Sequence, residues 1–207
     1  MSDVLDVFSQ REVVARVDLF SIDRVAGHDT ERPTWETSVE FLKPAVERAD
    51  GAARSRFARQ VDIDLWELNY VTLPFDLLRL DHGRYVEIRL RVRFDHPDVV
   101  AKYLAPDEHN KNDIPFSGVA RASGVGGPAF GWQFTPTTGQ KELFPRGNLV
   151  LFLLQRPRES TEYDLTLDVE AVIERQTLVV KRRDAKPQRP GRYRLSFDKG
   201  TFTPLPT

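Results

Sequence analysis

The chain has 207 residues, a formal net charge of −1 and no cysteine. This length suffices for one well-filled core, and the apolar (40%) and charged (29%) fractions are ordinary for a globular protein. The lack of cysteine excludes disulfides, Cys metal sites and thiol nucleophiles, and the near-zero charge gives no electrostatic argument for binding nucleic acid or an anionic membrane.

The N-terminal segment does not have the pattern of a signal peptide. Asp3 and Asp6 stand where basic residues are expected, and no apolar core follows them. The longest apolar run, Leu149 to Leu154, is far too short to span a bilayer. Arginine outnumbers lysine 23 to 7, which is typical of a GC-rich, bacterial genome. We therefore expect a bacterial cytoplasmic protein that has no contact with membranes.

The first third of the chain predicts two strands and an ambiguous segment. Glu12 to Ile22 alternates apolar and polar residues and predicts a strand. His28 to Thr34 is polar, contains Pro33 and predicts a loop, and Trp35 to Leu42 predicts a second strand. Pro44 to Arg59 is rich in Ala, Arg and Glu. It fits either a short helix or a charged excursion between strands.

The clearest pattern is Arg84 to Phe94, RYVEIRLRVRF. Because side chains alternate across a strand, this segment predicts one apolar face and one basic face. The apolar face contains Val86, Ile88, Leu90, Val92 and Phe94. The basic face contains Arg89, Arg91 and Arg93.

The segment after Phe94 changes character twice. Pro97 suits the first position of a helix and Pro106 lies beyond its end, so one or two helical turns are expected between them. A long Gly/Pro-rich insertion is then expected at about residues 105–147, where seven of the 12 glycines lie between Gly118 and Gly147. Residues 118–147 fit either a long ordered loop or short strands separated by turns, and GPAFGWQFTP fits a strand through Phe130, Trp132 and Phe134. Binding residues tend to lie on such segments when a rigid scaffold holds them.

The last third predicts strands. Asn148 to Gln155 is apolar on both faces, as in a central strand covered on both sides or a strand in an interface. Tyr163 to Glu174 alternates apolar residues with an acidic row, and we expect it in the same sheet as the basic row of Arg84 to Phe94. Gly191 to Phe197 predicts a final strand. The whole pattern is mainly β and favours a single antiparallel β-sandwich domain over residues 1–207, with one or two short helices.

Candidate binding residues fall in two places. Asp107, His109 and Asp113 belong to a polar run that could bind a ligand, although its spacing does not match an EF-hand loop and predicts no metal site. Arg89, Arg91, Arg93 and Trp132 are the other candidates, and the aliphatic residues between the arginines give little support to nucleic-acid binding.

Signatures of catalysis are missing. The four histidines have no zinc-ligand spacing, and Ser123 lacks the flanking glycines of a nucleophile elbow. Gly124 to Gly127 is followed by no Gly-Lys-Ser/Thr motif, which argues against a phosphate loop. We predict no catalytic residues, no metal and no cofactor.

These observations favour a non-enzymatic module that binds another protein, or itself, in a bacterial cytoplasmic assembly. One alternative is a small-molecule-binding or hydrolytic β domain with a pocket under residues 105–147. A second alternative is a membrane-acting β protein in which Phe and Trp side chains of residues 130–144 insert into lipid.

Overall fold

The computed structural model describes residues 12–24, 31–49, 51, 65–106, 118–176 and 180–206. Every element that it defines within these residues is a β-strand. The strands are β1 (Val13–Arg24), β2 (Glu31–Leu42), β3 (Ala45–Arg48), β4 (Trp66–Leu77), β5 (Gly83–Phe94), β6 (Val100–Ala105), β7 (Gly118–Ser123), β8 (Ala129–Pro136), β9 (Asn148–Pro157), β10 (Glu162–Gln176), β11 (Val180–Ala185), β12 (Gly191–Ser196) and β13 (Thr201–Pro204).

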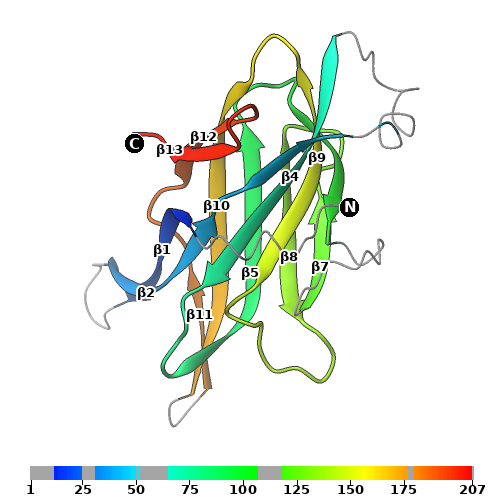
Figure 1. Cartoon of the computed structure of the whole chain (residues 1–207). Coiled ribbons are helices and arrows are strands. Elements are labelled where there is room, and N and C mark those ends of the chain that lie inside the picture. The colour runs from blue at the N-terminus through cyan, green and yellow to red at the C-terminus, as the bar shows by residue number, and fades with distance from the viewer. Residues whose placement is uncertain are drawn as a thin grey trace.

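The strands form two antiparallel sheets that pack face to face, so the predicted mainly-β sandwich is confirmed (Figure 1). Sheet A has the order β1-β2-β4-β9-β6, with β3 also paired to β4. Sheet B has the order β13-β12-β10-β5-β8-β7, with β11 also paired to β10. In Figure 1, β4 and β9 cross diagonally in front of the upright strands β10, β5 and β8.

Two local predictions are wrong. The helical turns expected after Pro97 are replaced by a bend and by strand β6, whose residues pair with the apolar strand β9. Strand β2 already begins at Glu31, inside the expected loop. Of the two arrangements expected for residues 118–147, the structure has the strands separated by turns: β7 and β8 lie there, and β8, which contains the expected strand through Phe130, Trp132 and Phe134, lies next to β5 within sheet B.

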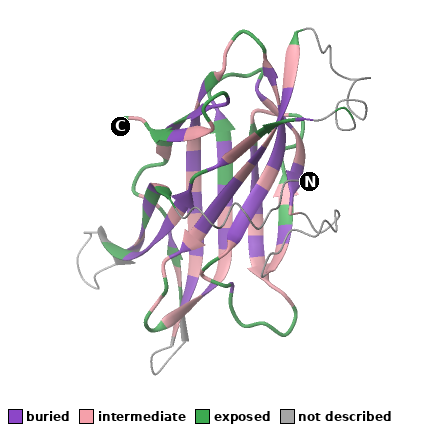
Figure 2. Cartoon of the chain, viewed as in Figure 1, coloured by how far each residue is buried: buried purple, intermediate pink, exposed green. Residues whose placement is uncertain are grey.

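The core lies between the two sheets, where the alternation of β5 places its apolar side chains. Ile88, Leu90, Val92 and Phe94 are all at most 2% exposed. Figure 2 shows the same alternation of buried and more exposed positions along the central strands. On β8, which carries Phe130, Trp132 and Phe134 in the core, the rings continue this apolar layer.

The predicted alternation of β5 fails at Val86. The pairing of β5 with β10 shifts register between Val172 and Ile173, so Tyr85 enters the core and Val86 is only half-buried. The Tyr85 hydroxyl donates a hydrogen bond to the Leu78 carbonyl at 2.5 Å and also contacts the Thr37 hydroxyl. Burial raises the pKa of Tyr85 to about 12, so it stays a neutral donor.

Hydrogen bonds link the two sheets at both sides of the sandwich. On one side, the β7–β8 turn bonds to β6, through Gly126 N to the Ala101 carbonyl at 2.7 Å and Ala101 N to the Gly127 carbonyl at 3.1 Å. On the other side, Phe20 of β1 and Lys186, just beyond β11, exchange backbone hydrogen bonds of 2.8 and 3.0 Å.

A buried ion cluster reinforces the second side. The Glu36 side chain on β2 is 1% exposed and binds Arg175 of β10 at 2.6 Å and Arg183 of β11 at 2.9 Å. Ser21 of β1 donates a hydrogen bond to the same carboxylate at 2.7 Å. One carboxylate on sheet A therefore holds two guanidinium groups of sheet B.

Candidate functional site

Charged side chains follow the outer face of sheet B in paired rows. The basic row of β5 lies beside the acidic row of β10, as the sequence predicted, with Arg91 opposite Asp168 and Arg89 opposite Glu170. The Arg89–Glu170 ion pair measures 3.2 Å, and Arg91 lies 3.7 Å from Asp168 and 3.8 Å from Glu170. Each acid of the row thus has a cation within ion-pair distance.

The acidic row is interrupted at Thr166. The register places this residue between Arg93 of β5 and Arg192 of β12. Arg192 binds Asp95 at 2.9 Å. Arg93 has Thr166 on one side and Ala129 on the other, and within the described residues it forms no ion pair. Arg93 is therefore a positive charge with no acid directly opposite it on either neighbouring strand.

A groove of about 700 Å³ lies on the same face, within the range of small-molecule sites. Its position depends on Gly131, which pairs with Arg91. A Cβ atom at this glycine would lie 2.3 Å from the Leu90 carbonyl oxygen, so a larger residue would force the strands apart. The groove is lined by Arg89, Arg91, Val92, Arg93, Arg121, Ala122, Ser123, Gly124, Ala129, Phe130, Gly131, Trp132, Gln133, Thr166, Asp168 and Pro190.

The groove has four arginines and one carboxylate among its lining residues. Burial raises the pKa of that carboxyl group, Asp168, and the negative charge of Glu170 raises it further, although Arg91 acts in the opposite direction. The electrostatic character of the groove is therefore basic, and hydroxyl donors from Ser123 and Thr166 lie beside the arginines.

The structure brings together four of the seven residues that the sequence marked as binding candidates. Arg89, Arg91, Arg93 and Trp132 all border the groove. The Trp132 ring is 2% exposed and packs on Phe130 and Phe152, so it supports the wall from the core. Asp107, His109 and Asp113 lie outside the described residues.

Sequence reasoning missed the residues that shape the groove. Gly131 inside an aromatic strand signals a close backbone approach, and Thr166 interrupts a row of acids. Arg121 had no such signal, because its place beside β8 depends on pairing between β7 and β8.

A second candidate is the loop of residues 137–147 between β8 and β9, which lies at the lower end of the sandwich in Figure 1. Leu143 anchors it, being 2% exposed and donating its backbone N–H to the Tyr85 carbonyl at 2.9 Å. The Gly147 N–H bonds to the Asp76 carboxylate at 2.9 Å. The next residue after the anchor, Phe144, is 52% exposed.

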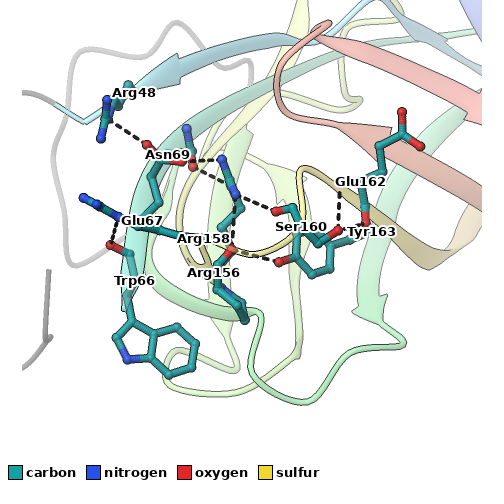
Figure 3. A network of polar contacts seen from close by, with 10 residues as sticks. Arg48, Trp66, Glu67, Asn69, Arg156, Arg158, Ser160, Glu162 and Tyr163 are labelled. Carbon is teal, nitrogen blue, oxygen red and sulfur yellow. Dashed lines mark hydrogen bonds and ion pairs between the residues drawn. The ribbon is translucent and has the colours of Figure 1, made fainter. Parts of the chain in front are cut away.

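A third polar cluster surrounds Arg156 at the end of β9 (Figure 3). Its side chain is 3% exposed and donates to Asn69 at 3.0 Å, to the Ser160 carbonyl at 2.7 Å and to Glu67. Its guanidinium also lies 4.8 Å from the centre of the Phe197 ring. Since protein groups satisfy this arginine, it clamps β4, β9 and the following turn and offers no site for a ligand.

Within the described residues, no group of three or more His, Asp or Glu side chains is placed to hold a metal ion. The described residues also contain no helix long and apolar enough to cross a bilayer.

The fold and groove define an antiparallel two-sheet β protein with a basic groove on the outer face of one sheet. No family model and no curated protein matches the sequence. Among solved structures, the chain is similar to the Clostridium perfringens NetB toxin in its membrane-inserted form, at 6% identity and a TM-score of 0.42, over 92% of this chain and 100% of that one.

Two further structures are similar at the same low level. The Clostridium perfringens delta-toxin is 7% identical with a TM-score of 0.42, and the match covers 94% of this chain and 96% of that one. A protein described as pore-forming is 7% identical with a TM-score of 0.39, over 90% and 100% of the two chains. Similarity this weak gives no correspondence between individual residues.

These similarities contradict four expectations from the sequence. The interpretation as a non-enzymatic assembly module of the cytoplasm is wrong, as are the cytoplasmic location and the expected lack of membrane contact, because the similar structures include a membrane-inserted toxin and a pore-forming protein. The general description of the chain as a cytoplasmic, protein-binding module is wrong for the same reason. Self-association remains compatible with these findings.

Proposed function

We propose that the protein is a membrane-acting β protein that docks on a lipid surface through the loop of residues 137–147. The observation that carries this proposal is Phe144, an aromatic residue held in an exposed position by the buried Leu143 beside it. Lys141 and Arg146 flank it on the exposed loop surface. An aromatic ring between basic side chains is suited to the interface between lipid headgroups and acyl chains.

Hydrogen bonds hold the loop of residues 137–147 in the conformation that exposes Phe144, so binding to lipid requires no rearrangement of its backbone. Backbone hydrogen bonds connect Leu77 N to the Pro145 carbonyl at 2.6 Å and Gln140 N to the Thr137 carbonyl at 2.9 Å. The Asn148 side chain also donates to the Phe144 carbonyl at 3.0 Å. A loop fixed in this way loses little conformational entropy when it binds, so more of the transfer energy of the ring contributes to affinity.

Of the aromatic side chains of residues 130–144 that were expected to insert into lipid, Phe144 is the one we propose for this role. Phe130, Trp132 and Phe134 are in the core and do not reach solvent. Phe144 is 52% exposed, and moving that exposed half from water into lipid contributes about 1–1.5 kcal/mol, or about tenfold in partitioning.

Vesicle flotation tests this function. The protein is mixed with phosphatidylcholine vesicles, and bound protein is measured after flotation for the wild type and for Phe144→Ser. We expect about tenfold weaker partitioning of the variant. Val125→Ser is the matched control, because Val125 is 60% exposed in the turn that precedes β8, at the opposite end of that strand from the loop.

Two results would contradict the proposal: wild-type protein that stays with the soluble fraction, or equal losses for the two variants. Dye release from the same vesicles distinguishes a protein that only docks from one that opens the bilayer. Chemical crosslinking on the vesicles tests self-association, which stays a prediction.

A further inference from the structure

The arginine without an acid partner, the break in the acidic row and the groove coincide on the outer face of sheet B. Arg93 is the last of the three basic positions Arg89, Arg91 and Arg93 along β5, and both of its cross-strand neighbours, Thr166 and Ala129, are uncharged. Among the described residues, the ion pairs of Arg91 are the two long contacts of 3.7 Å to Asp168 and 3.8 Å to Glu170. These two guanidinium groups retain hydrogen-bond donors for an external anion.

The neighbouring positions make the contrast clear. Two residues before the break in the row, Asp164 of β10 binds Arg194 of β12 through two hydrogen bonds of 2.7 and 3.2 Å. Side-chain hydrogen bonds from Arg194 hold the pKa of that carboxyl group below its ordinary value. At Thr166 the same geometry has cations on both flanking strands and no carboxylate between them.

We propose that this groove binds a phosphate-bearing ligand, with the phosphate group beside Thr166 in the place that an acidic side chain occupies elsewhere in the row. Arg93 and Arg91 would hold its oxygens by charge-assisted, forked hydrogen bonds. The hydroxyl groups of Thr166 and Ser123 add neutral donors, and Arg121 closes the β7 side. The groove volume of about 700 Å³ leaves room for the organic part of the ligand.

The shape of the floor supports the same assignment. Along β8 the residues opposite Arg89, Arg91 and Arg93 are Gln133, Gly131 and Ala129, so the side chains facing the groove become small where the charge is uncompensated. Space and positive charge therefore occur together. This site lies on a different surface from the 137–147 loop and does not depend on the proposed docking mode.

Isothermal titration with glycerol phosphate, at constant ionic strength, tests the proposal on the full chain. We expect saturable binding that is at least about tenfold weaker in Arg93→Gln, because a charge-assisted bidentate contact is lost. Thr166→Asp should weaken binding by a similar factor, since its carboxylate supplies the missing partner for Arg93 from within the protein.

Arg194→Gln is the matched control, because it removes a cation from the same face that already has its own acid. It should bind glycerol phosphate within about twofold of the wild type. Thermal melting of each variant verifies that it is folded, and Thr166→Asp should melt no lower than the wild type. Phe144→Ser should bind glycerol phosphate normally, which separates this site from the docking loop.

Vesicles of phosphatidylcholine with and without phosphatidic acid identify the source of the phosphate. If the wild type binds more strongly to vesicles with phosphatidic acid and Arg93→Gln loses this gain, the phosphate belongs to a lipid headgroup. If glycerol phosphate binds and the vesicles do not, the ligand is soluble. Both results support the site. The proposal fails if neither probe binds, or if Arg194→Gln weakens binding as much as Arg93→Gln does.

Discussion

Replacement of Glu36 by alanine tests whether the ion cluster between the sheets contributes to stability. The carboxylate is 1% exposed and accepts hydrogen bonds from Ser21, Arg175 and Arg183, at 2.7, 2.6 and 2.9 Å. Removing one partner of a buried ion pair costs about 3–5 kcal/mol. The Arg175 and Arg183 side chains are 39% and 31% exposed, so both can turn toward water in the variant. We therefore expect the free energy of unfolding to fall by about 3 kcal/mol, the low end of this range.

In a chain of this size each kcal/mol lowers the melting temperature by about 2–4 °C, so Glu36→Ala should melt about 6–12 °C lower. The control is Glu162→Ala, which breaks an exposed pair with Lys199 whose side chains are 42% and 71% exposed. That loss should stay below about 0.5 kcal/mol. Urea denaturation and differential scanning calorimetry measure both variants. If the two variants lose the same stability, the cluster does not hold the sheets together.

Two further predictions concern the core and pH. Leu90→Asp should unfold the protein, because Leu90 is 1% exposed and an unpaired carboxylate there costs several kcal/mol. Arg91→Ser, one position along, should change stability by less than about 1 kcal/mol, since its side chain is 60% exposed. Similar melting shifts for this pair would show that the faces of β5 are assigned wrongly. Burial acts to raise the pKa of Glu36, but hydrogen bonds from Ser21 and Arg183 and the charge of Arg175 outweigh it, so the pKa lies below the ordinary value of 4.5. A carboxylate with a lowered pKa stabilises the fold above its unfolded-state pKa, and this contribution is lost as pH falls through the folded-state value. The stability difference between wild type and Glu36→Gln should therefore be constant near neutral pH and shrink below about pH 4.5; a difference that is unchanged in acid would contradict the assignment.

Alternation predicted the parts of this fold that depend on one strand at a time. The apolar face around Leu90 and the acidic row of residues 164–170 could be read from the sequence because a period of two leaves few alternatives. Opposite charges on the two rows also indicated that they share a sheet, and the structure confirms that β5 and β10 are neighbours.

The remaining features depend on pairing that a single segment does not encode. Val100–Ala105 forms a strand despite helix-start residues before it, because the edge of β9 offers backbone hydrogen bonds. The bulge that moves Tyr85 into the core arises from a register shift against β10. Only the combined register of β5, β10 and β12 shows that Thr166 lies between two arginines.

The backbone hydrogen bonds of Ala101 with Gly126 and Gly127, and of Phe20 with Lys186, bear on how the molecule opens. The first set joins β6 of sheet A to the turn between β7 and β8 of sheet B. The second joins β1 of sheet A to the residue that follows β11 of sheet B, on the opposite side of the sandwich. Because the sheets are joined at two opposite edges, neither sheet can rotate away from the other about a hinge at one edge. Amide protons at Phe20 and Gly126 should exchange with solvent only when most of the core opens, so the two sheets lose structure as one cooperative unit.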